Sequence, residues 1–118
     1  MLIVLDRSGS MKEIAGGQSK WQSARQAVTS ITSQFEGQLG IGLMLYPRYP
    51  DAGGCAAGTL NVPLSPNSKS DIATVLNKVV PNGDTPIAAT FDSARKELNS
   101  GEHVILISQA GVAGSSSV

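Results

Sequence analysis

The residues most suited to chemistry follow the first apolar run of the chain. Asp6, Ser8 and Ser10 are spaced two apart in a glycine-containing loop, directly after Met1–Leu5. A turn that points alternate side chains in one direction would bring a carboxylate and two hydroxyls together. Such oxygen ligands of low total charge suit Mg²⁺, which prefers about six oxygens and keeps several waters. The loop therefore predicts a cation site, with turn formation and backbone capping as the alternative role of these side chains.

Two further polar segments are expected at the same place, because ligands of open α/β sheets collect at the carboxyl ends of the strands. Thr85 precedes a proline in a pattern typical of a helix start, and it would offer a third hydroxyl. Taken alone, Thr85 indicates only a helix cap. It becomes a candidate metal ligand because it is expected at the same edge of the sheet as Asp6. Ser108-Gln109 directly follows another apolar run.

Strands that could position these loops are predicted from the apolar runs. Met1–Leu5, Leu39–Tyr46 and Val104–Ile107 are apolar almost throughout, as expected for strands covered on both faces of a parallel sheet. Thr59–Leu64 alternates apolar and polar residues and contains a proline, which predicts an edge strand.

Three amphipathic helices are predicted between these strands, with apolar residues at helical spacing. The first begins at the capping box Ser19-Lys-Trp-Gln22 and ends at Gly37. The second begins near Ser68 and stops before Pro81, and the third begins at Thr85-Pro86. This order predicts an α/β fold: a Rossmann-like, open, mainly parallel sheet with one antiparallel edge strand and helices on both faces.

The loop Asp6-Arg7-Ser8-Gly9-Ser10-Met11, together with Gly83-Asp84-Thr85-Pro86, resembles the von Willebrand factor type A family. The resemblance covers residues 1–109, and the Gly/Ser-rich end at 110–118 is expected to be a flexible tail. It implies a metal-ion-dependent adhesion site for Mg²⁺ or Mn²⁺. Asp6, Ser8, Ser10 and Thr85 would be its metal ligands, and an acidic residue of a partner protein would complete the metal shell.

The sequence departs from the family pattern in two places. The family usually has an Asp-Gly pair after the strand corresponding to Val104–Ile107, and Gln109-Ala110 stands there instead, so cation affinity should fall. Asp84, beside Thr85, is a nearby carboxylate that could compensate. Family domains also usually continue through further strands and helices. We therefore expect a truncated domain whose last strand is an edge that more chain or another subunit completes.

Composition excludes several other classes of protein. Nine Lys and Arg balance nine Asp and Glu, which removes the long-range attraction that nucleic acid or an anionic membrane would need. No apolar run approaches the roughly 20 residues needed for membrane insertion. The single cysteine, Cys55, excludes an internal disulfide. It is expected to be a free thiol, unless a cysteine beyond residue 118 pairs with it.

The function that these patterns favour is a non-catalytic, metal-dependent adhesion or scaffolding module. A degenerate, metal-free interaction domain is the alternative that Gln109 suggests. A Mg²⁺-assisted phosphoryl-transfer enzyme is less favoured, since that chemistry needs further carboxylates and a basic residue on the phosphate. The pair Tyr46 and Tyr49 is a candidate for an exposed rim of the site, because tyrosine is favoured at interfaces. The resemblance also favours an extracellular or cell-surface location.

Overall fold

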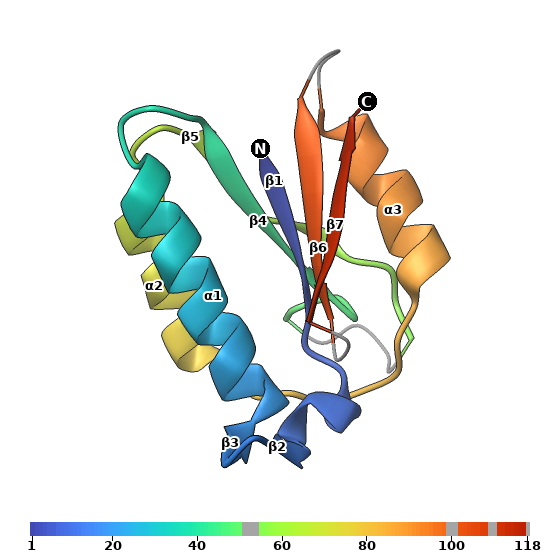
Figure 1. Ribbon diagram of the computed structural model, residues 1–118. Coiled ribbons are helices and arrows are strands. Elements are labelled where there is room, and N and C mark those ends of the chain that lie inside the picture. The colour runs from blue at the N-terminus through green and yellow to red at the C-terminus, as the bar shows by residue number, and fades with distance from the viewer. Residues whose placement is uncertain (51–54, 99–101, 109–110, 118) are drawn as a thin grey trace.

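A five-stranded sheet in the order β5-β4-β1-β6-β7 forms the centre of the molecule (Figure 1). The structure, a computed structural model, describes residues 1–50, 55–98, 102–108 and 111–117. β1 pairs in parallel with β4 and β6, and the edge strands β5 and β7 are antiparallel to their neighbours. The predicted mainly parallel α/β sheet is therefore confirmed, with a second antiparallel edge in addition. The strands are β1 (Leu2–Asp6), β4 (Ile41–Tyr46), β5 (Thr59–Ser65), β6 (His103–Ser108) and β7 (Gly111–Ser117).

The backbone of β7 differs from the flexible tail expected over 110–118. Gly111–Ser117 runs antiparallel to β6, from the pair Ser108↔Gly111 to the pair His103↔Ser117. Glycine and serine have low strand propensity, so the sequence of this segment carries no strand signal. Pairing nevertheless satisfies the row of backbone groups that β6 would otherwise expose. Val104–Ile107 is thus not the edge of the sheet that the sequence predicted.

Helices cover both faces of the sheet, as predicted (Figure 1). α1 and α2 lie on one face, and α3 lies on the other. A short 3₁₀ helix, η1, and a small hairpin, β2–β3, connect β1 to α1. Among the described residues, no helix has the length and apolar character needed to cross a membrane. The bounds are η1 (Gly9–Lys12), β2 (Ile14–Ala15), β3 (Gln18–Ser19), α1 (Lys20–Phe35), α2 (Lys69–Lys78) and α3 (Ile87–Lys96).

The core is divided by the sheet into two apolar clusters. Ile3 and Leu5 of β1 pack into the cluster on the side of α1 and α2, with Trp21 and Val28. Leu2 and Val4 pack into the cluster on the side of α3. Successive side chains of a strand point to opposite faces, so Leu2–Leu5 must all be apolar to fill both clusters. The remaining members of the second cluster are Met44, Tyr46, Ala94 and Val104.

The predicted helix starts have three different outcomes. The Ser19 hydroxyl accepts a hydrogen bond from the Gln22 N–H at 3.1 Å, so the cap of α1 is confirmed. The hydroxyl of Ser68 does not cap α2 but donates to the Ile41 carbonyl at 2.6 Å, which lies at an irregularity of the β4–β5 pairing. α3 starts one residue later than predicted, with Pro86 rather than Thr85 as its N-cap.

Gly42 allows β5 to approach β4 closely. A Cβ atom on this residue would lie 2.8 Å from the Val62 carbonyl oxygen and 3.0 Å from a methyl group of Leu64. At Gly40 the nearest atom would be 3.8 Å away, which is an ordinary contact. The close approach at Gly42 therefore requires glycine, whereas Gly40 has room for a side chain.

Candidate functional site

Asp6, the last residue of β1, is fully buried at the carboxyl end of the central strand. Its Oδ1 accepts a hydrogen bond from the Ser8 N–H at 2.8 Å. Its Oδ2 is also buried, and it has no hydrogen-bond partner among the residues that the structure describes. A buried carboxylate oxygen is costly unless a charge or a donor satisfies it. Oδ2 is therefore available to a cation, and this observation fits the ligand set that the sequence predicted.

The two serines of the same loop lie close to each other. Their hydroxyl oxygens are 3.1 Å apart; Ser8 is buried and Ser10 is half-buried. The chain turns here because Ser8 is extended and η1 follows at once, with the Met11 N–H donating to the Ser8 carbonyl at 3.0 Å. Met11 itself is fully buried, so its side chain anchors the turn in the core. The loop thus gathers one carboxylate and two hydroxyls on a fixed backbone.

The loop that contains Thr85 is bonded to this turn. The Gly9 N–H donates to the Gly83 carbonyl at 2.9 Å, and the Asn82 N–H donates to the Arg7 carbonyl at 2.6 Å. Gly83 has a φ of 91°, which glycine adopts without strain. Thr85 follows two residues later and is half-buried. The structure therefore joins the two loops through their backbones, while only the two serines of the predicted set have side chains in direct contact.

Arg7 is a functional candidate that the sequence analysis missed. It is only 2% exposed, and its guanidinium donates to the carbonyls of Pro47 at 2.9 Å, Arg48 at 2.7 Å and Val80 at 3.4 Å. Its guanidinium carbon also lies 5.3 Å from the centre of the Tyr49 ring, within cation–π distance. Arg7 thereby ties the loop after β4 and the segment after α2 to the end of β1. A charged residue in a polar turn gives no sequence signal of such burial.

Tyr46 does not belong to an exposed rim, and that expectation was wrong. It is fully buried at the end of β4, where it is the register partner of Asp6. Its carbonyl accepts the Arg7 N–H at 2.7 Å, whereas its hydroxyl has no hydrogen-bond partner within the described ranges. Burial, and next the charge of Asp6, raise the pKa of Tyr46 well above its usual value of 10.0. Tyr49 is half-buried against Arg7.

The start of α3 is held to the sheet by Thr90, another residue that the sequence analysis missed. Its hydroxyl accepts a hydrogen bond from the Gly58 N–H at 3.1 Å and donates to the Pro86 carbonyl at 2.6 Å. Ile87, the first residue of this helix, is apolar but 40% exposed, whereas the polar Thr90 is only 1% exposed. The polar bonds of Thr90 explain how a threonine takes the buried position.

Other residues with reactive or ligating side chains lie apart from these contacts or outside the described residues. Cys55 is an exposed free thiol, and His103 is exposed at the start of β6. Asp84 is exposed beside Thr85, and Gln109 lies outside the described residues. Within the described part of the chain, no three His, Cys, Asp or Glu side chains gather as a metal cluster. A cation near Asp6 would therefore depend on one carboxylate and on hydroxyl oxygens.

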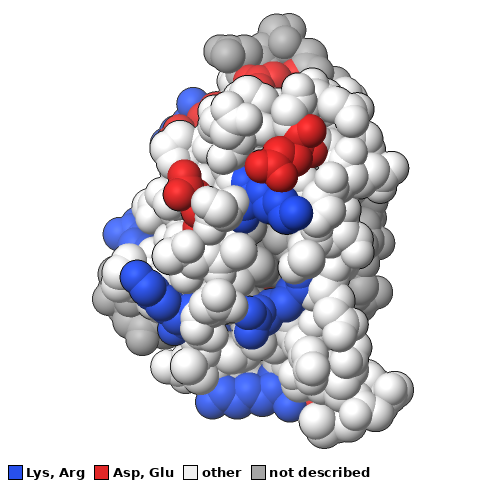
Figure 2. All heavy atoms as spheres, turned by 90° about the vertical axis from the view of Figure 1, so that its left-hand side faces the viewer, with Lys and Arg blue, Asp and Glu red and all other residues white. Residues whose placement is uncertain are grey.

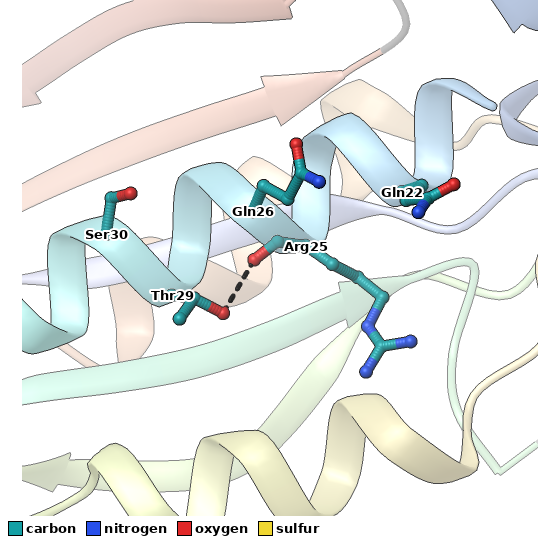
Figure 3. A pocket seen from close by; sticks show the side chains of 5 residues that line it. All are labelled: Gln22, Arg25, Gln26, Thr29 and Ser30. Carbon is teal, nitrogen blue, oxygen red and sulfur yellow. Dashed lines mark hydrogen bonds between the residues drawn. The ribbon is translucent and has the colours of Figure 1, made fainter. Parts of the chain in front are cut away.

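Two surface depressions of the described chain lie on the outer faces of α1 and α3. One of them is on α1, where the Thr29 hydroxyl donates to the Arg25 carbonyl at 2.9 Å (Figure 3). The face that carries α1 and α2 is mostly uncharged, with acidic and basic side chains scattered over it (Figure 2). Neither the depression on α1 nor the one on α3 is lined by residues of the loops around Asp6. The lining residues of the α1 depression are Gln22, Arg25, Gln26, Thr29 and Ser30, and a second depression on α3 is lined by Asp92, Arg95 and Lys96.

Comparison with known protein families agrees with this fold and loop arrangement. Residues 1–111 match the von Willebrand factor type A domain. The chain therefore belongs to the von Willebrand factor type A family. A comparison with curated proteins finds no match. Domains of this family generally mediate protein–protein interaction and are typically not enzymes, and they often bind a metal ion.

Proposed function

We propose that this chain is a metal-dependent protein-binding module. Asp6, Ser8, Ser10 and Thr85 would hold Mg²⁺ or Mn²⁺, and an acidic side chain of a partner protein would bind to the cation. The observation that carries this proposal is Asp6 Oδ2, a buried carboxylate oxygen with no hydrogen-bond partner among the described residues, in the same turn as the contacting hydroxyls of Ser8 and Ser10.

The charges of the ligand set explain why a carboxylate would be the preferred partner group. A bound divalent cation supplies a positive centre, and Asp6 contributes a single negative charge to it. The hydroxyls of Ser8, Ser10 and Thr85 are neutral. A net positive charge therefore remains, and it attracts an incoming Asp or Glu side chain. Hard oxygen ligands of this kind favour Mg²⁺ or Mn²⁺ over metals that prefer thiolate or imidazole.

The chain's own residues supply the rigidity that such a site needs. The Ser8 N–H holds Asp6 Oδ1 in place and thereby leaves Oδ2 for the cation. Met11 anchors the serine turn in the core, and Arg7 fixes the neighbouring loops through three carbonyls. Ligands held by packing and by hydrogen bonds of this kind keep their geometry without a large loss of entropy on binding.

Thermal unfolding tests the proposal directly. A cation that binds only the folded chain raises the midpoint of unfolding, Tm, in a concentration-dependent manner. We expect millimolar Mg²⁺ or Mn²⁺ to raise the Tm of the parent chain relative to chelator, and we expect Asp6→Ala to abolish the rise. The matched control is Asp84→Asn, which removes an exposed carboxylate of the adjoining loop and should keep the rise.

Each other outcome contradicts a stated part of the proposal. A parent chain whose Tm ignores both cations would favour a metal-free interaction domain. A rise that survives Asp6→Ala would place the ion elsewhere, and loss of the rise in Asp84→Asn would make that carboxylate a ligand. Partner binding is tested with an immobilised acidic peptide. Retention in Mg²⁺ and release by chelator are expected, and equal retention in both would exclude the cation bridge.

A further inference from the structure

We infer that the partner segment which binds the carboxyl edge of the sheet carries apolar side chains beside its acidic residue. The acidic residue would bind the cation, and the apolar side chains would pack on Ile14, Val80 and Ile87 of this chain. The inference rests on the proposed function for the acidic residue. It adds the chemical class of the rest of the partner's binding segment, which the cation alone does not specify.

Large exposed apolar side chains gather at this end of the sheet. Ile14 is 71% exposed, Val80 is 64% exposed and Ile87 is 40% exposed. The hairpin β2–β3 and the segment between α2 and α3 lie at the lower end of Figure 1, where β1 ends. Among the described residues of this kind, Leu39 alone lies at the opposite end, before the start of β4. Single exposed apolar residues are common on protein surfaces, but a group of them at one edge indicates a binding surface.

Ile14 is held in solvent by a closed hairpin rather than by a free loop. It follows Glu13, whose N–H donates to the Ser10 carbonyl at 3.1 Å. The Glu13 carbonyl accepts the Lys20 N–H at 2.9 Å, and the side chains of these two residues form an ion pair at 2.9 Å. Two glycines with positive φ close the turn at residues 16–17. The hairpin therefore fixes Ile14 beyond the serine turn with its side chain exposed.

Val80 and Ile87 are connected to the other parts of the site. The Val80 carbonyl accepts a hydrogen bond from the guanidinium of Arg7, the residue after Asp6, at 3.4 Å. The Ile87 N–H donates to the Thr85 carbonyl at 2.9 Å. The three exposed side chains therefore come from three segments, each bonded to the loops that carry the predicted ligands. A partner segment bound to the cation would extend over these segments.

The charges near the site leave apolar contacts to supply the remaining affinity. The charged side chains of residues 9–20 and 79–87 are Lys12, Glu13, Lys20 and Asp84, and their charges cancel. Apart from the cation, these segments therefore carry no excess charge that would attract a partner. Burial of apolar surface is the dominant favourable term in most protein association. A segment with apolar side chains on either side of its carboxylate thus fits this edge better than a polar acidic segment.

Two capped peptides of equal length and charge test the inference. One peptide has leucine on each side of a single aspartate, and the other has serine at both places. We expect the leucine peptide to bind the parent chain in Mg²⁺ about fivefold to tenfold more tightly in an NMR titration, the effect of partly burying apolar side chains. Equal affinity of the parent for the two peptides, or binding of neither, would overturn the inference.

The variants locate the apolar contact. In the double variant Ile14→Ser/Val80→Ser the preference should fall below about twofold. The Tm and its rise with Mg²⁺ should stay unchanged, because both side chains are exposed. Ile87→Ser tests the third segment independently and should also lower the preference. Leu39→Ser is the matched control, since it removes an exposed apolar side chain at the opposite end of the sheet, and it should keep the full preference.

The remaining outcomes separate the inference from the proposed function. A preference that survives in the double variant and in Ile87→Ser would overturn the inference, and so would its loss in Leu39→Ser. If the Tm of the parent still rises with Mg²⁺ in those cases, the proposed cation site stands. A parent whose Tm ignores Mg²⁺ and which prefers the leucine peptide equally in chelator would overturn both, because the carboxylate would then have no cation to bind.

Discussion

Asp6 and Tyr46 are direct neighbours on parallel strands, and each ends its strand with a buried polar atom that lacks a hydrogen-bond partner in the described chain. The backbone holds the pair rigidly, because the Arg7 N–H next to Asp6 donates to the Tyr46 carbonyl. The chain thus keeps two unsatisfied groups at one edge of an otherwise apolar layer.

The raised pKa of Tyr46 predicts a loss of stability at high pH. Between the unfolded value of 10.0 and the higher folded value, the folded chain binds one more proton than the unfolded chain, so the free energy of unfolding falls as pH rises. The contribution of the protonated Tyr46 hydroxyl to the free energy of unfolding is complete below pH 10 and decreases above it. Urea unfolding between pH 8 and pH 11 should show this decrease, and it should be shallower in Tyr46→Phe. Equal slopes in the two chains would contradict the assignment.

Thr85 should matter for cation binding and little for folding. α3 has Pro86 as its N-cap and no side-chain capping bond, so Thr85→Ala should change the free energy of unfolding by less than about 0.5 kcal/mol. If its hydroxyl is a ligand, the Mg²⁺-induced rise in Tm should shrink in Thr85→Ala and remain in Thr85→Ser. A full rise in the alanine variant would remove Thr85 from the ligand set.

Arg7 should contribute strongly to stability, because its guanidinium satisfies three carbonyls in a nearly closed environment. Arg7→Met leaves those acceptors without this donor, and we expect a loss of about 3 kcal/mol in the free energy of unfolding. Arg25→Met is the control. Arg25 lies at the surface of α1, where its guanidinium donates to Asn77, so its loss should be below about 1 kcal/mol. If urea unfolding gave the two variants equal losses in the free energy of unfolding, the buried hydrogen bonds of Arg7 would not contribute to stability.

The two glycines of the β4 region should respond differently to a methyl group. Gly42→Ala forces a contact with the Val62 carbonyl, so we expect a loss of about 1–3 kcal/mol in the free energy of unfolding. Gly40→Ala meets only ordinary contacts and should be close to neutral. Thermal or urea unfolding of both variants checks the difference, and similar stabilities would contradict the close approach of β5.

The central part of the fold could be predicted from the sequence because burial leaves a pattern. Met1–Leu5 is apolar at every position since β1 fills two clusters, and the Ser19 cap has a recognisable spacing. β7 could not be predicted, because its residues have low strand propensity. It forms a strand through backbone pairing with β6, which its own sequence does not indicate. The start of α3 also shifted by one residue, since a Thr-Pro pair does not specify which of the two is the cap.

For the candidate site, the sequence could indicate only the proposed ligands. Asp6, Ser8 and Ser10 could be identified because a carboxylate and hydroxyls with regular spacing follow a strand. The supporting residues Arg7 and Thr90 could not, because their roles depend on carbonyls and loops that are distant in the sequence. A side chain that acts through such contacts is recognised only after the sheet order is known.

The bonds between the loops at this edge have a consequence for how fast and how tightly a partner can bind. Arg7 and Gly9 join the turn after β1 to the segment at 80–83, so the loops are ordered in the chain without any ligand. Docking then needs little rearrangement, and the encounter rate should be set by diffusion and charge rather than by a slow loop closure. Differences in affinity between partners should accordingly appear in how long each complex persists.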